Sequence, residues 1–139
     1  MRHNKRKVTT TVQQRLQQLR NALLALHKAL IDSERVTYEQ TIGAIQSPNH
    51  FLQLLTGDPW FAWLPALSQL IVAMDEALDE KEPLTTANVD DLVNQTRLLL
   101  VASEDGDGFS KHYFDALQRD PDVVLAHAEV VKFLGSRKG

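Results

Sequence analysis

The stretch VQQRLQQLRNALLALHKAL, residues 12–30, decides the fold of this chain. Its apolar residues recur at alternating spacings of four and three, which is the period of one face of an α-helix; they are Val12, Leu16, Leu19, Leu23, Leu26 and Leu30. The apolar stripe then drifts around the helix as 3.6 residues per turn requires, through Ile31, Tyr38, Ile42 and Ile45. These positions predict one helix over residues 9–45, roughly 50 Å long at 1.5 Å per residue. A helix of that length either wraps the other helices of a small domain or pairs with a copy of itself.

Three later helices are marked by a capping residue directly before proline, at Ser47-Pro48, Asp58-Pro59 and Asp120-Pro121. The capping oxygen accepts a backbone N–H that has no partner within the helix, and proline lacks an N–H that would be unpaired at the first helical position. These signals, with a threonine cap at Thr85 or Thr86 and a glycine-rich loop at 106–108, predict helices over 48–55, 59–80, 86–101, 109–118 and 121–134. No segment alternates with period two, so the sequence predicts an all-α, single-domain bundle of five or six helices.

Charge is distributed unevenly along the 139 residues, whose net charge is −3. Four basic residues lie in residues 1–8, which we predict to be a flexible basic tail ahead of a single helical domain over 9–139. Between Asp75 and Asp107 there are ten acidic and two basic residues, a local charge of −8. Because so acidic a body repels phosphate backbones, we do not expect nucleic-acid binding beyond a weak contact through the tail.

Composition excludes several classes of protein. The chain has no cysteine, so it has no disulfide framework and no thiolate metal site. No apolar run approaches the length of a membrane span, and the basic start is not followed by the apolar segment of a signal peptide. We therefore expect a cytoplasmic protein that does not associate with a membrane.

The segment GDPWFAWLP, residues 57–65, contains both tryptophans. Counted at 100° per residue, Trp60 and Trp63 fall on the inner stripe of the 59–80 helix, where core packing is expected. Phe61, Pro65 and Val72 form a second apolar column on another side. A helix that is apolar on two sides is either central in the bundle or covered by a partner, so these three residues are candidate interaction residues.

Three residues on two helices could form a chemical site. His27 and Glu34 lie on the first helix and His127 lies in the stripe of the last, so packing of the two helices would bring them together. Such a cluster would suit a metal ion or an acid–base pair, and a bundle enzyme or metal protein is the alternative function. No spacing motif supports ligation, since both Glu-x-x-His and His-Glu-x-x-His are absent. The sequence therefore predicts structural histidines, with no cofactor and no catalytic residue assigned.

The run ERVTYEQTIGAIQSPNHFLQLLTGDPWFAWLPALSQLIVAMDE, together with YFDALQRDPDVVLAHAEV, resembles a group of small bacterial all-helical proteins without an assigned activity. The similarity covers roughly residues 30–134 and implies a bacterial, cytoplasmic origin. From the long amphipathic helix and the two-sided helix after Pro59, we expect a non-enzymatic interaction or regulatory module that forms a homodimer or another homo-oligomer, or binds another protein.

Overall fold

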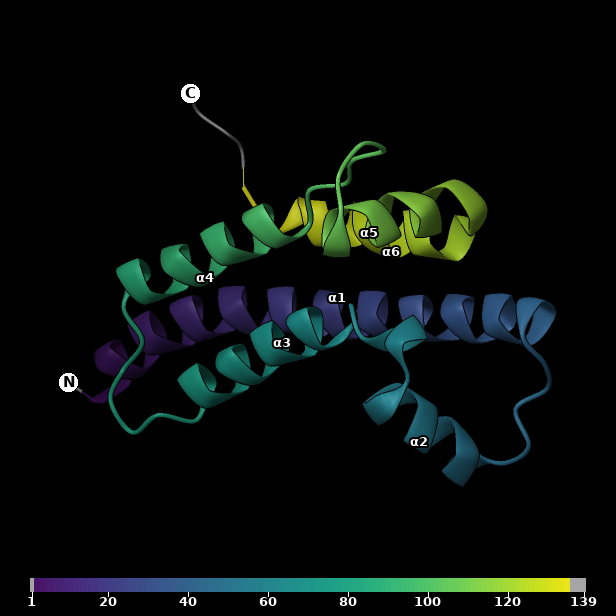
Figure 1. Ribbon diagram of the computed structural model, residues 1–139. Coiled ribbons are helices and arrows are strands. Elements are labelled where there is room, and N and C mark those ends of the chain that lie inside the picture. The colour runs from purple at the N-terminus through teal and green to yellow at the C-terminus, as the bar shows by residue number, and fades with distance from the viewer. Residues whose placement is uncertain (1, 136–139) are drawn as a thin grey trace.

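The computed structural model describes the backbone of residues 2–135 and the side chains of residues 11–135. Within these residues the chain forms six α-helices, one short 3-10 helix and no strand (Figure 1). They are α1 (Arg2–Thr41), α2 (Pro48–Gly57), η1 (Pro59–Phe61), α3 (Pro65–Leu78), α4 (Thr86–Leu99), α5 (Gly108–Arg119) and α6 (Pro121–Lys132). The predicted all-α class is confirmed. The side chains of the predicted basic tail, residues 1–8, lie outside the described residues, and the flexibility of that tail stays a prediction.

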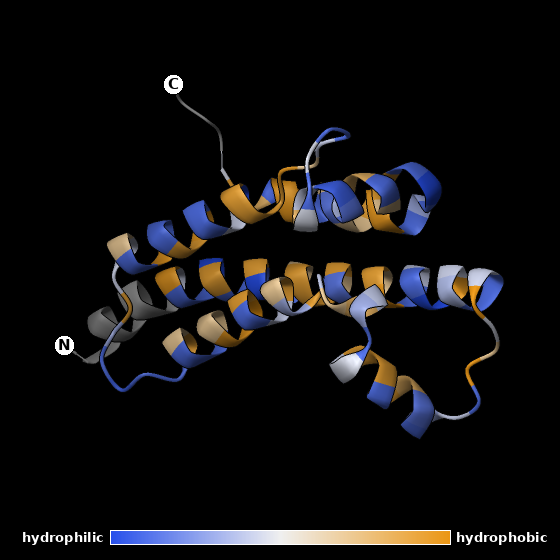
Figure 2. Ribbon diagram, in the orientation of Figure 1, coloured by the Kyte–Doolittle hydropathy of each residue, from blue (hydrophilic) through white to orange (hydrophobic). Residues whose placement is uncertain are grey.

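Helix α1 is the long element against which the others pack. The stripe from Leu16 to Leu30 is buried as expected: Leu16, Leu23, Leu26 and Leu30 are completely inaccessible to solvent. Helices α3, α4, α5 and α6 all contact α1, and Figure 1 shows them distributed along its length. In Figure 2 the apolar residues of α1 gather in its middle, where these helices lie against it. Within the described part of the chain, no helix has both the length and the apolar character needed to cross a membrane.

The end of α1 differs from the prediction by four residues. The helix stops at Thr41, where the N–H groups of Ile42 and Gly43 both donate to the carbonyl of Tyr38, at 2.7 and 3.3 Å. Gly43 then adopts a φ of 153°, which favours glycine and turns the chain out of the helix. Ile45 consequently packs against the core from a loop.

The three predicted proline caps are confirmed. The side-chain oxygens of Ser47, Asp58 and Asp120 accept hydrogen bonds from backbone N–H groups two or three residues ahead, at 3.0, 2.8 and 2.9 Å. Each bond replaces one that the start of a helix cannot make for itself. The caps therefore define the starts of α2, η1 and α6.

The predicted continuous helix over 59–80 is wrong, because Pro65 divides it. Residues 58–64 form tight turns with hydrogen bonds between residues three apart, including Ala62 N to Pro59 O at 3.2 Å and Leu64 N to Phe61 O at 3.1 Å. Pro65 has no N–H to continue these turns as an α-helix, and it instead occupies the first position of α3. Since 3-10 geometry rotates about 120° per residue, the side chains before Pro65 point in other directions than a helical wheel predicts.

Phe61 is the residue that this change affects most. Of the two predicted alternatives for its apolar column, central in the bundle or covered by a partner, its side chain fits the first, because it is completely buried within the chain. Tyr38 and Phe51 cover it within the same chain, with ring centroids 5.6 and 5.8 Å away. Trp60 packs edge-on against Tyr38 at 5.5 Å. Phe61 is therefore a core residue and is withdrawn as a candidate contact for a partner.

Candidate functional site

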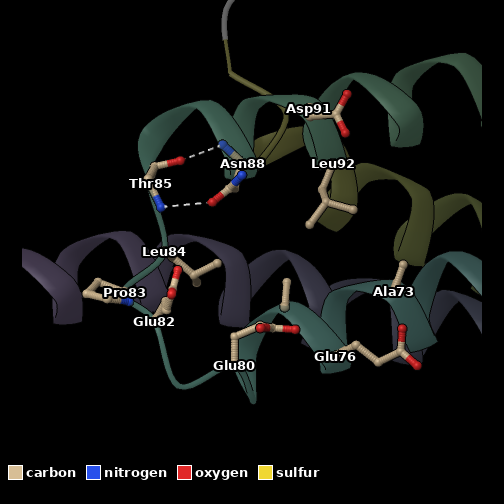
Figure 3. Close-up of a pocket in the computed structure, with 11 residues that line it drawn as sticks. Ala73, Glu76, Glu80, Glu82, Pro83, Leu84, Thr85, Asn88, Asp91 and Leu92 are labelled. Carbon is tan, nitrogen blue, oxygen red and sulfur yellow. Dashed lines mark hydrogen bonds between the residues drawn. The ribbon is translucent and has the colours of Figure 1, made fainter.

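A groove runs along the seam between α3 and α4. It consists of two adjoining cavities, of about 510 and 290 Å³, that share Ala73. We call it the α3–α4 groove; its lining residues are Ala66, Gln69, Leu70, Ala73, Glu76, Ala77, Glu80, Glu82, Pro83, Leu84, Thr85, Asn88, Asp91, Leu92, Gln95 and Leu99. In the close-up of its larger cavity, Leu84 and Leu92 point into the space between the two helices (Figure 3).

Side-chain size explains why the seam stays open. Ala73 and Ala77 occupy successive turns on the α3 side, where each side chain is a single methyl group. Leu70 and Leu92 are 7% and 8% exposed and form the floor with these alanines. Among the described residues, no hydrogen bond or ion pair joins a side chain of α3 to one of α4. The two helices thus share an apolar floor without closing over it.

Two residues that line the larger cavity, Thr85 and Asn88, are held in place by the cap at the start of α4. Thr85 Oγ1 accepts from the N–H of Asn88 at 3.0 Å, and the Thr85 N–H donates to Asn88 Oδ1 at 3.2 Å (Figure 3). This reciprocal capping box satisfies two N–H groups at the start of the helix and holds both side chains in place. Both residues line the larger cavity, so the cap also shapes one wall of the groove.

The rim of the groove is acidic. Glu76, Glu80, Glu82 and Asp91 line the larger cavity, and neither lysine nor arginine is among its described lining residues. Figure 2 shows the hydrophilic character of most of the loop that joins the two helices. The sequence signalled this feature through its local charge of −8.

Of two neighbouring acidic residues on α3, and of two on α4, one contacts α1 and the other lines the groove. Asp75 forms an ion pair with Arg20 of α1, and Asp90 forms one with Arg15 at 3.0 Å. The next residue in each case, Glu76 or Asp91, faces the groove. Arg15 and Arg20 of α1 therefore pair with one carboxylate each on α4 and α3, while the four carboxylates that line the larger cavity form no ion pair within the described residues.

Glu34 is not placed as the predicted chemical site requires. Its side chain is buried, and its Oε2 accepts from Arg119 Nη2 at 2.8 Å. Arg119 Nε also donates to Ser33 Oγ at 3.1 Å. Glu34 thus serves a buried ion pair that ties the end of α5 to α1.

The two histidines of that site are half-buried, and burial lowers the pKa of His27 and of His127. His127 Nδ1 lies 2.6 Å from the hydroxyl of Tyr113, a fully buried residue whose own pKa burial raises. Within the described residues, no group of three or more histidine, aspartate or glutamate side chains is arranged to hold a metal ion. The sequence reasoning missed Tyr113 and Arg119 as partners because nothing in local spacing links them to His127 and Glu34.

The other predicted interaction residues lie at the surface. Val72 is 51% exposed and lines none of the described cavities, while Pro65 is exposed and lines a third cavity of about 340 Å³. That cavity lies where α2, η1 and α3 meet; its lining residues are Leu55, Thr56, Gly57, Asp58, Pro59, Ala62 and Pro65.

The two tryptophans pack against the core as predicted, although from η1 and the turn before Pro65 and not from one continuous helix; Trp60 is partly and Trp63 almost completely buried. Trp63 lies between Phe109 and His112, with ring centroids 5.0 and 5.3 Å away. Both indole nitrogens are buried and have no hydrogen-bond partner within the described residues. Each ring therefore contributes to stability through its apolar area, at the cost of an unsatisfied N–H.

Comparison with known proteins returned no match: no family model fits the chain, and neither a curated protein nor a solved structure is significantly similar to it. The resemblance to small bacterial proteins stays a prediction from the sequence.

Proposed function

We propose that this chain is a non-enzymatic, cytoplasmic interaction module that associates with a second copy of itself as a homodimer. The observation that carries the proposal is the α3–α4 groove, an open seam between two helices with a nearly buried apolar floor and an acidic lining. A groove of this kind, with exposed apolar side chains beside it, is typical of sites where proteins bind one another.

Exposed apolar side chains flank the groove on both sides. Val72 follows Gln69 by three residues and precedes Glu76 by four, so it lies on the same side of α3 as the groove rim. Leu98 follows Asp91 by seven residues, which places it above the α4 rim, and it is 77% exposed. A partner that fills the groove would therefore also cover Val72 and Leu98.

The residues that an enzyme or metal site would need support the same proposal. Glu34 accepts from Arg119, and His127 is hydrogen-bonded to Tyr113, in partly buried contacts between helices. Their polar atoms contribute to the stability of the bundle, and the open surface lies elsewhere on the molecule.

Light scattering during gel filtration tests the proposal. The chain has a mass of 15.7 kDa, and we expect twice that mass at tens of micromolar. A single mass of 15.7 kDa at every concentration in that range would refute self-association.

A matched pair of variants locates the contact. Val72→Ser combined with Leu98→Ser removes the apolar flanks, and we expect it to weaken dimerisation. Leu125→Ser is the control, because Leu125 is 66% exposed on α6, away from the groove. If the control weakens dimerisation as much as the double substitution does, the dimer contact is not specific to the groove.

A further inference from the structure

The acidic rim restricts how two copies can meet. If both copies presented the α3–α4 groove to each other, Glu76, Glu80 and Glu82 of one would face the same carboxylates of the other. Like charges brought together across an interface are strongly unfavourable. The groove therefore needs a basic occupant.

Most cations of the folded body already have a partner. Arg15, Arg20, Lys28, Lys111, Arg119 and Lys132 each form an ion pair with a carboxylate of the same chain. Arg97 donates to the carbonyl of Leu134, and Arg35 lies over the ring of Phe51 at 5.1 Å. Lys81, which lies between Glu80 and Glu82 in the sequence, is the one described lysine or arginine outside this set. The densest group of basic residues in the sequence is Arg2, Lys5, Arg6 and Lys7, four charges in six residues, and their side chains lie outside the described residues.

We propose that the α3–α4 groove binds the basic segment Arg2–Lys7 of a second copy, an inference that rests on the proposed self-association. The first 31 residues contain no acidic side chain, so nothing in that segment opposes the rim. The segment also lies at the N-terminal end of α1, where the helix dipole adds partial positive charge.

The position of α1 allows each copy to place its basic segment in the groove of the other. The N-terminal end of α1 and the loop between α3 and α4 lie at the same end of the molecule (Figure 1). Two copies related by a two-fold axis at that end can each offer a basic segment to the other's groove, which closes the assembly as a dimer. Residues 2–8 of a helix span roughly 10 Å, and the α3 wall from Ala66 to Ala77 spans roughly 16 Å, so the groove is long enough for the segment.

A charge-swap experiment tests this pairing by sedimentation velocity on the full chain. One variant carries Glu76→Lys and Glu80→Lys, and the other carries Lys5→Glu and Arg6→Glu. Each pair of substitutions cancels the net charge of one side of the contact, −4 in the groove lining or +4 in the segment. We therefore expect each variant alone to dimerise at least about tenfold more weakly than the wild type. In an equimolar mixture, one contact of the mixed dimer again joins the wild-type segment to the wild-type groove, and the substituted charges are opposite in the other contact, so dimers are partly restored.

The control variant carries Glu104→Lys and Asp105→Lys, which makes the same change in net charge on exposed residues of the loop between α4 and α5. We expect it to dimerise like the wild type at equal ionic strength. If the groove variant also dimerises like the wild type, or if the mixture stays monomeric, the pairing is wrong while self-association stands. If the wild type itself is monomeric, self-association fails and this inference fails with it.

Discussion

Two pairs of helices pack against α1, and they differ at the seam within each pair. The α5–α6 seam is closed: Tyr113, Ala116, Val123 and Val130 are completely buried, and Tyr113 is hydrogen-bonded to His127 across it. The α3–α4 seam is open, with cavities of about 510 and 290 Å³ above Leu70 and Leu92. Each pair also buries fully inaccessible residues, such as Met74 and Val89 in α3 and α4.

We infer from this difference that α5 and α6 mainly stabilise the fold, whereas α3 and α4 form a binding surface. In α5 and α6, Tyr113 and His127 are hydrogen-bonded to each other, and Arg119 donates to Ser33 and Glu34 of α1. The acidic residues that line the α3–α4 groove form no ion pair within the described residues, although Lys81 lies between two of them in the sequence. Substitutions in the first pair should therefore alter stability, and substitutions in the second should alter association.

The largest expected effect is that of Tyr113→Ala in the closed seam. Removing a fully buried aromatic ring leaves a cavity, and we expect the free energy of unfolding to fall by about 3 kcal/mol or more. Tyr113→Phe keeps the ring and loses only the bond to His127, at a cost of about 1 kcal/mol. Urea unfolding measures both, with Gln95→Ala in the open seam as the comparison, for which we expect a change of less than about 0.5 kcal/mol. Equal losses at Tyr113 and Gln95 would remove the distinction between the seams.

Arg119→Ala should have the next largest effect. The substitution leaves the buried carboxylate of Glu34 without its partner, which we expect to cost about 2 kcal/mol, less than the roughly 3–5 kcal/mol of a fully buried pair because Arg119 is 31% exposed. Lys28→Ala removes the exposed pair with Asp32 and serves as the control, with an expected loss below about 0.5 kcal/mol. A loss at Arg119 no greater than that at Lys28 would show that the buried pair does not hold α5 to α1.

The pH dependence of stability should be smaller and should come from α1 and the closed seam. Burial lowers the pKa of His27 and His127 below the ordinary value of 6.5 in the folded chain, so the unfolded chain binds more protons in mild acid. The resulting stability is fully present above pH 6.5 and is lost as the pH falls through the folded-state values. The melting temperature should decrease as the pH is lowered below 6.5, and this decrease should be smaller in His127→Gln than in the wild type. An unchanged slope in that variant would place the titration elsewhere.

The smallest expected effect on stability is that of Glu80→Gln on the groove rim. Glu80 is exposed and shares the cavity with Glu76 and Glu82, so losing its charge relieves repulsion and breaks no ion pair of the described residues. We expect the free energy of unfolding to change by less than about 0.5 kcal/mol, with any change an increase at low salt. A loss above about 1 kcal/mol would mean that the rim is part of the packed structure.

The sequence predicted what depends on local chemistry and missed what depends on three-dimensional packing. The stripe through Leu16 and Leu30 and the cap at Ser47 could be predicted, because apolar period and capping chemistry act within a few residues. The continuous helix over 59–80 was wrong, because Pro65 divides it into a tight turn that contains Phe61 and a new helix. The acidic rim could be predicted from the local charge. The groove could not, because the small side chain of Ala73 leaves a gap only where α4 packs opposite α3.

The most direct test of the two-seam account is a dilution series of the ¹⁵N-labelled wild-type chain followed by NMR. As dimers dissociate, the amide signals of residues lining the α3–α4 groove and of residues 2–8 should move, while those of α5 and α6 should stay in place. The account is contradicted if the signals of α5 and α6 shift while those of the groove residues do not, or if no signal shifts on dilution.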